Sequence, residues 1–274
     1  MAYTRRACYH SRLRGLHDLR SRMLQTDFVT LTGLLVVAAV VGSFLGTLIL
    51  RLPVGLAVVT GRSECPNCNG PLGPRDLVPL LSWASARGRC RTCAAPISVF
   101  YPFIELAAIG VALWSWSVVE GWVLWASCFF GWLLLTLAVL DWRHQLLPDK
   151  LTLLLVPSGV GVAYFIEPAD AIDHIIGAIA GFIAFAAVAW TYRRIRGRDG
   201  LGGGDLKLLA GLGAWVGWIG LPTIILLSTF MALATVAARM ILGERFAATD
   251  RLAFGTYLAA AGWLVWLYGP LVPM

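Results

Sequence analysis

Charged residues are scarce in this sequence. Only 14% of its 274 residues are Asp, Glu, Lys or Arg, whereas 58% are hydrophobic, and the mean hydropathy is +0.75. A soluble domain has about 25% charged residues, so the composition excludes a soluble enzyme. Long polar and low-complexity tracts are also lacking, which excludes a disordered protein. The 12 Trp and 29 Gly suit membrane helices, which carry Trp at the interfaces and Gly at helix contacts, so we expect an integral membrane protein.

Uncharged stretches long enough to cross a bilayer recur along the chain. A transmembrane helix needs about 20 residues. We expect single spans at 28–50, about 98–119, 121–140, 151–166, 175–192 and 252–274. The stretch 208–238 is too long for one crossing, and Gly220-Leu221-Pro222 offers a turn within it, so two spans are expected there. The predicted fold is an all-α polytopic membrane protein with about eight transmembrane helices.

Lys and Arg are missing from every second turn between these spans. After residue 50 they fall only within 51–91, 143–150, 193–207 and 239–251. The positive-inside rule therefore puts these four segments in the cytoplasm, in a multi-pass protein of the cytoplasmic (inner) membrane. The net charge of +7 is explained by this topology, so we expect no nucleic-acid partner.

The basic tail, residues 1–27, disagrees with this orientation. Six Arg lie within its first 22 residues, yet eight spans would place the tail outside. Either later helices overrule the tail, or translation starts at Met23, which would restore the rule.

Two Cys-x-x-Cys pairs lie in the longest polar segment, residues 51–97. Cys65 and Cys68 are separated from Cys90 and Cys93 by 21 residues, close to the spacing of four-cysteine zinc sites. Four thiolates leave no open coordination position, so the predicted zinc is structural. Two disulfides or four idle thiols are the alternatives, and a reducing cytoplasm argues against the disulfides. We therefore expect a small zinc-binding cytoplasmic loop domain after the first helix, 28–50.

Asp141 and Asp205 stand at the cytoplasmic ends of two expected spans. Each alone suits a helix cap or a solvated flank. Together, at matching depth, they could share a proton, so that one deprotonates water while the other protonates a carbonyl oxygen. The triple glycine at 202–204 lacks the Gly-Lys-Ser/Thr ending of a phosphate loop. We expect Asp149 to cap the following helix and Lys207 to be a flanking charge only.

The motifs from residue 42 onward resemble those of the type IV prepilin peptidases, membrane aspartic enzymes that process pilins and the pseudopilins of type II secretion. The resemblance is carried by Gly42-Ser43-Phe44-Leu45 with Arg51-Leu52-Pro53, by Pro79-Leu80-Leu81-Ser82-Trp83 between the cysteine pairs, by Pro96-Ile97-Ser98, Tyr101-Pro102 and Glu105, by Asp141 with Leu147-Pro148-Asp149, and by Gly202 to Lys207. It implies that Asp141 and Asp205 are the catalytic pair, within a membrane peptidase core at 98–274. Glu105 lies inside the second span, where a charge usually has a partner, such as a basic residue of the loop or the substrate leader.

The resemblance also implies a substrate and a second activity. Family members cut prepilins after the Gly that ends a short basic leader, at the cytoplasmic face. Many then methylate the new N-terminus with S-adenosylmethionine, and the four-cysteine loop is typical of these two-function enzymes. The family usually has Asn where this chain has Gly46, a departure that bears on methylation more than on cleavage. A peptidase without methylation, a transporter and a non-enzymatic scaffold remain alternatives.

Overall fold

The computed structural model describes residues 28–56, 64–65, 67–197, 200–243 and 252–271. The basic tail and its alternative start at Met23 lie outside the described residues. Within them, contacts divide the chain into two units, one of residues 28–44 and 64–116 and the other of residues 45–56 and 117–271. The described chain is nearly all helical, with isolated β-bridges only around the cysteine pairs.

The first unit joins most of a long helix, Phe28–Val54, to the cysteine loop and to helix α3, Phe100–Val118. The loop carries two short helices, η2 (Pro74–Asp76) and α2 (Leu81–Ser85). Gly42 allows the long helix to approach α3 closely, because a Cβ at Gly42 would lie 2.7 Å from the Cα of Glu105. Small residues permit such backbone contacts between membrane helices.

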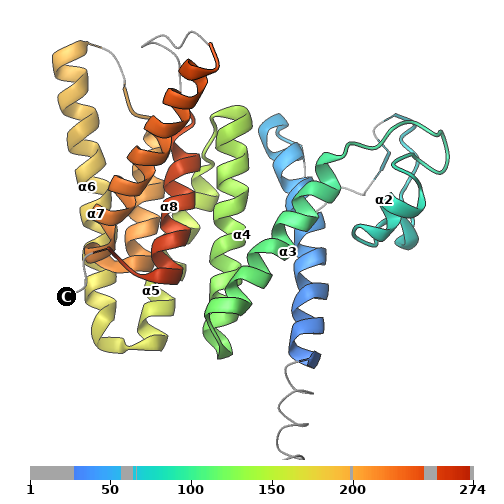
Figure 1. Cartoon of the computed structure of the whole chain (residues 1–274), viewed down its shortest axis with the longest axis horizontal. Coiled ribbons are helices and arrows are strands. Elements are labelled where there is room, and N and C mark those ends of the chain that lie inside the picture. Colours follow the sequence, from blue (N-terminus) through green and yellow to red (C-terminus); the bar gives the residue numbers. More distant parts are fainter. Residues whose placement is uncertain (1–27, 57–63, 66, 198–199, 244–251, 272–274) are drawn as a thin grey trace, which may run out of the picture. The chain divides into compact units, whose positions relative to one another are not determined.

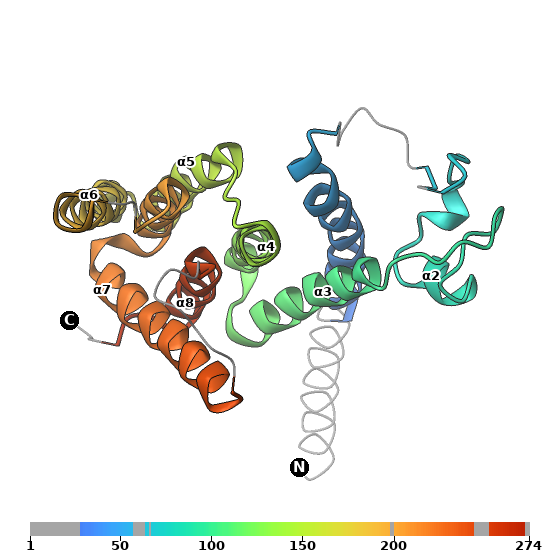
Figure 2. The ribbon, with the colours of Figure 1, turned by 90° about the horizontal axis from the view of Figure 1, so that it is seen from above.

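In the described part of the second unit, helices α4 to α8 form a bundle (Figures 1 and 2). These are α4 (Gly121–His144), α5 (Asp149–Ile166), α6 (Ala171–Arg196), α7 (Gly203–Ile241) and α8 (Phe254–Tyr268), with short η1 (Leu52–Val54) and η3 (Pro168–Asp170). Helix α7 packs against α5, α6 and α8, and α4 packs against α8. The amino-terminal half of α7 therefore lies in the middle of the bundle, where Leu208, Leu209 and Leu212 are fully buried.

Glycines bring α7 close to its neighbours. A Cβ at Gly181 of α6 would lie 2.7 Å from the carbonyl oxygen of Leu209, and a Cβ at Gly159 of α5 would lie 2.6 Å from that of Ala214. Because lipid tails are as apolar as Leu, membrane helices associate by such close packing rather than by the hydrophobic effect. At these two glycines, α6 and α5 come into close contact with the backbone of α7.

Helix α7 is broken at Gly217, where φ is 72° and ψ is 174°. The sequence predicted a turn here, but at Gly220-Leu221-Pro222; the break comes earlier because only glycine adopts this conformation without strain. Pro222 has no N–H to donate to the carbonyl of Trp218, but it lies just after the break, near the start of the second part of the helix, where proline is tolerated. The break deprives the Ala214 carbonyl of its helical donor, and His174 Nδ1 on α6 lies 2.9 Å from that oxygen.

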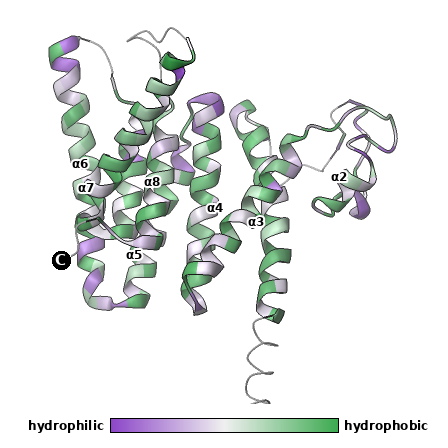
Figure 3. Ribbon diagram, viewed as in Figure 1, coloured by the Kyte–Doolittle hydropathy of each residue, from purple (hydrophilic) through white to green (hydrophobic). Residues whose placement is uncertain are grey.

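Within the part of the chain that the structure describes, six helices are long and apolar enough to cross a membrane, and hydrophobic residues predominate along them (Figure 3). They are Phe28–Val54, Phe100–Val118, Gly121–His144, Asp149–Ile166, Pro168–Arg196 and Gly203–Ile241. Counting the two halves of α7 separately and adding α8, which has 15 residues, gives the eight predicted spans. The all-α polytopic fold is confirmed, and the chain is a multi-pass membrane protein.

Candidate active site and metal centre

Asp141 lies in the last turn of α4 and is only 5% exposed. Its carboxylate accepts hydrogen bonds from the start of α8. The Thr256 N–H donates to Oδ2 at 2.8 Å, the Thr256 hydroxyl lies 3.4 Å from the same atom, and the Gly255 N–H also donates to the carboxylate. The amino terminus of α8 therefore holds this side chain in place.

Asp205 lies inside the first turn of α7 and is 8% exposed. The sequence predicted it just before a span, whereas the helix begins two residues earlier, at Gly203. Its carboxylate accepts a hydrogen bond from the backbone N–H of Gly202. A Cβ at Gly202 would lie 3.3 Å from Asp205 Oδ2. Because glycine has no Cβ, this oxygen can approach the backbone of Gly202.

The bundle brings the two aspartates together. Asp141 and Asp205 are close enough for their carboxylates to repel each other electrostatically. Leu147, in the loop after α4, explains this proximity, because its side chain packs against both Gly204 of α7 and Gly255 of α8. A Cβ at Gly255 would lie 3.0 Å from Asp141 Oδ2, so both glycines allow the helix starts to close on the site.

Two charged neighbours differ from the prediction. Asp149 is the first residue of α5, and Pro148 rather than Asp149 occupies the N-cap position, without a side-chain cap. The expected cap is wrong because the helix already begins at Asp149. The Asp149 side chain forms an ion pair, with 2.6 Å between its Oδ1 and Lys207 Nζ. Lys207 is therefore more than a flanking charge.

Sequence reasoning missed the contribution of α8. Gly255 and Thr256 carry no charge and belong to no motif used above. Their only sequence signal is a glycine at the start of an apolar stretch, directly after a basic segment. Such a signal does not reveal that α8 begins against Asp141, since the contact spans 115 positions of the chain.

The four cysteines of the loop meet in one cluster. The Sγ atoms of Cys65, Cys68, Cys90 and Cys93 all lie within 4.8 Å of one another, and those of Cys65 and Cys93 are 3.8 Å apart. A tetrahedral zinc with Zn–S distances of about 2.3 Å separates its ligand sulfurs by about 3.8 Å. All the described cysteines are free thiols, so the residues fit a four-thiolate zinc site and not the disulfide alternative.

The two cysteine pairs have the same backbone structure. In each, the first Cys N–H donates to the carbonyl five residues on, at Gly70 or Ala95, and the residue after the second Cys has a positive φ, 53° at Asn69 and 55° at Ala94. An antiparallel bridge closes each turn. The repeat presents both sulfurs of each pair on one side of its turn.

Backbone N–H groups favour the thiolate form of some of these cysteines, which is the form that binds a metal cation. Hydrogen bonds from the N–H groups of Cys93 and Thr92 lower the pKa of Cys90 to about 6. At Cys68, the Gly70 N–H favours the thiolate, but hydrogen bonding to the Cys93 and Cys65 sulfurs and burial raise the pKa to about 11. Cys90 therefore loses its proton easily, whereas the binding of a metal ion must displace the proton of Cys68.

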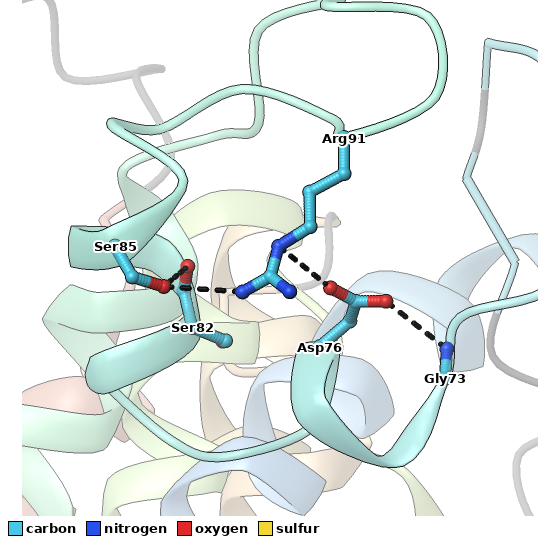
Figure 4. Close-up of polar contacts among 5 residues, drawn as sticks. All are labelled: Gly73, Asp76, Ser82, Ser85 and Arg91. Carbon is cyan, nitrogen blue, oxygen red and sulfur yellow. Dashed lines mark hydrogen bonds and ion pairs between the residues drawn. The ribbon is translucent and has the colours of Figure 1, made fainter.

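Arg91, between the second pair of cysteines, ties the cluster to the rest of the loop (Figure 4). Its Nε lies 3.2 Å from Asp76 Oδ1, and its Nη2 donates to the Ser85 hydroxyl at 3.2 Å. Asp76 also accepts the Gly73 N–H at 3.1 Å. The cysteine turn is thus held against both η2 and α2.

Glu105 anchors the same loop to α3. Its side chain is 5% exposed, and its Oε2 accepts the Leu80 N–H at 2.8 Å. Ser43, on the long helix, also donates to this carboxylate. Leu80 has a φ of 59°, a strained conformation for a residue with a side chain that surrounding contacts must maintain. Among the described residues, the partners of Glu105 are therefore the Leu80 backbone N–H and the Ser43 hydroxyl.

Comparison with known proteins shows where the chain belongs. The model of the bacterial peptidase A24 N-terminal domain matches residues 36–119, and that of the type IV leader peptidase family matches residues 128–237. A prepilin leader peptidase/N-methyltransferase of Aeromonas hydrophila is 37% identical over 258 residues, which cover 84% of this chain and 87% of its own. The chain belongs to the type IV leader peptidase family.

Other relatives agree with this assignment. The proteins of the same name from Stutzerimonas stutzeri and Pseudomonas aeruginosa are 36% and 35% identical, over 86% and 84% of this chain and 89% and 87% of their own. No solved structure matches the chain. The predicted resemblance is confirmed, and membership of the type IV leader peptidase family identifies an enzyme rather than a transporter.

Proposed function

We propose that this leader peptidase removes the basic leader from prepilins or prepilin-like secretion proteins and then methylates the new N-terminus with S-adenosylmethionine. The observation that supports this most strongly is the meeting of two buried carboxylates, Asp141 and Asp205, from helices that are distant in sequence. The names of its relatives join the two activities on prepilins. The peptidase that has lost methylation, suggested by Gly46, is the second candidate.

The dyad would hydrolyse the peptide bond without a covalent intermediate. Asp141 accepts hydrogen bonds from the backbone N–H groups of Thr256 and Gly255, and the Thr256 hydroxyl lies 3.4 Å from it. These donors favour its charged form, and repulsion between two close carboxylates leaves Asp205 to hold the shared proton. Asp141 takes a proton from water, whose oxygen attacks the carbonyl carbon, while Asp205 protonates the carbonyl oxygen. As the C–N bond breaks, Asp141 protonates the leaving amine and the hydroxyl proton returns to Asp205.

Charge placement supports a site at the cytoplasmic face of the inner membrane. The dyad lies at the carboxyl end of α4, which also carries Arg143 and His144. The carboxyl end of α6 carries Arg193, Arg194 and Arg196, and its chain leads into the start of α7 with Asp205. Because Lys and Arg flank spans on the cytoplasmic side, this topology gives the dyad access to a basic leader before it leaves the cell interior.

The cysteine cluster would hold one structural zinc ion. All four ligands would be thiolates of Cys65, Cys68, Cys90 and Cys93, with no position left for water or substrate. Zinc would therefore maintain the loop, through Arg91 and its partners, and take no part in peptide hydrolysis.

Mass spectrometry of a cleaved substrate tests the proposal. The purified protein is mixed with a prepilin that carries a basic leader, Gly, Phe and an apolar helix, with and without S-adenosylmethionine. Leader loss together with the added mass of one methyl group supports both activities. Leader loss alone would favour the second candidate, and no cleavage by folded, zinc-loaded protein would contradict the proposal. The Asp205→Asn variant is the control.

A further inference from the structure

An ion pair joins the two aspartate motifs at a second point. Lys207 Nζ lies 2.6 Å from Asp149 Oδ1. Asp149 begins α5, after the short loop that follows the helix of Asp141, and Lys207 lies two residues beyond Asp205 in α7. The segments that carry the two neighbouring carboxylates are thus also joined by an ion pair.

The two connections leave α7 in different directions. Residues two apart on a helix do not face the same side, so the ion pair of Lys207 lies on a different side of α7 from the carboxylate of Asp205. Packing against α5, α6 and α8 places α7 in the bundle, and the ion pair adds a directional polar contact one half-turn from Asp205. Leu147 packs against Gly204, but Gly202, Gly203 and Gly204 have no side chains with which to form a polar contact to α5.

The exposure of the Lys207–Asp149 ion pair indicates that it positions residues rather than stabilises the fold. The side chain of Lys207 is 33% exposed and that of Asp149 is 63% exposed, and exposed ion pairs contribute little to the free energy of folding. A catalytic group, in contrast, must be held within about 0.5 Å of its working position, and an error of about 1 Å can lower a rate about 100-fold. A contact that is weak in energy can therefore matter for the rate.

We propose that the Lys207–Asp149 ion pair is a positioning device that sets the rotation of α7 and so holds Asp205 against Asp141. Both members are positioning residues, because each acts through Asp205. The inference depends on the proposed catalytic role of the dyad.

A double-mutant cycle on leader cleavage tests this inference. Lys207→Met and Asp149→Asn are each expected to lower kcat about 10- to 100-fold with KM changed less than about twofold, because alignment and not substrate binding is disturbed. The double variant is expected to be no slower than either single variant, since the two residues act as one unit. Lys207→Arg keeps the charge and is expected to restore most of kcat. Lys150→Met, which removes an exposed positive charge next to Asp149, is the matched control.

Several results would overturn the inference. These are additive losses in the double variant, a loss confined to KM, full kcat in Lys207→Met, or a fall in Tm that follows kcat across the variants. The last outcome would make the pair a stabilising contact only. Asp205→Asn is measured in parallel: wild-type cleavage by that variant would refute the proposed dyad itself, whereas its inactivity together with a normal Lys207→Met variant refutes only the positioning role.

Discussion

The two buried aspartates have unequal surroundings. Asp141 receives donors from both backbone and side chain at the start of α8, whereas the carboxylate of Asp205 receives the N–H of Gly202, three residues before it in the chain. Hydrogen bonds to a carboxylate favour its charged form. This inequality supports our proposal that Asp141 is the base and that Asp205 holds the proton, a distinction that two identical residues in a sequence do not reveal.

Replacing either aspartate by Asn is expected to abolish leader cleavage. Asn keeps the shape of the side chain but cannot exchange a proton, and general acid–base groups contribute about 100- to 10,000-fold to a rate. Cleavage is measured on purified protein, with the thermal unfolding curve as the control for folding. Wild-type activity in Asp141→Asn or Asp205→Asn would remove the dyad from the mechanism.

The Thr256 hydroxyl provides a second test, of how the surroundings of Asp141 affect cleavage. Thr256→Val keeps the backbone N–H but removes the hydroxyl, which lies 3.4 Å from Asp141 Oδ2 and donates to the Ala138 carbonyl at 3.0 Å. A lost hydrogen bond costs about 1 kcal/mol, so kcat is expected to fall about fivefold. Thr256→Ser, which keeps the hydroxyl, serves as the comparison. Equal kcat for the Val and wild-type proteins would show that the hydroxyl has no role.

At the scale of elements, glycine contacts decide how the helices assemble. Gly181 of α6 lies against the backbone of α7 at Leu209, and Gly159 of α5 lies against Ala214. The break at Gly217 then redirects α7, and His174 supports the freed carbonyl of Ala214. Since α7 carries Asp205 at its start, its packing against α5 and α6 determines where that carboxylate stands.

Gly181→Val is expected to destabilise the bundle. Its added atoms would collide with the α7 backbone, and such overpacking costs about 1–3 kcal/mol. The measurement is the thermal unfolding midpoint in detergent. Gly161→Val on α5 is the matched control, because no atom lies within 4 Å of a Cβ built there. A midpoint as high as that of the control would contradict the close packing of α6 and α7.

The cysteine loop is attached to α3 through Glu105. Glu105→Ala removes the acceptor of the Leu80 N–H and so releases a strained backbone from α3. We expect the segment around Leu80 to become more accessible to protease, with zinc content unchanged, because the cysteine turns close through their own backbone hydrogen bonds. Limited proteolysis and metal analysis on the same preparation test this. An unchanged digestion pattern would show that Glu105 does not hold the loop.

At the scale of the whole molecule, the proposed zinc site and the proposed peptidase site consist of different side chains. The cysteines lie in the first unit and the aspartates in the second. Chelation of zinc is therefore expected to lower methylation more than leader cleavage, because the dyad needs no metal. The two products are followed by mass spectrometry before and after chelation and after zinc is restored. Cleavage that is lost at once on chelation, and that returns at once with zinc, would contradict the aspartic mechanism.

Much of this organisation is visible in single stretches of sequence. Apolar runs predicted the spans, and the spacing of Cys65, Cys68, Cys90 and Cys93 predicted a common cluster, because two residues between thiols bring both to one ion. The break in α7 was placed a few residues late, at Gly220 to Pro222 instead of Gly217. Proline marks where a helix is weak, but the conformation at the break requires glycine, and several glycines compete nearby.

The sequence by itself determined the class of protein, the spans and the residue types of both sites, because composition, periodicity and short spacings are local properties. Only the tertiary structure decided which segments meet. Thr256 lies beside Asp141, Lys207 beside Asp149, and Leu80 beside Glu105, and none of these contacts follows from a local pattern. They depend on how closely helices approach at Gly42, Gly181, Gly204 and Gly255, where the absence of one side chain allows two distant segments to touch.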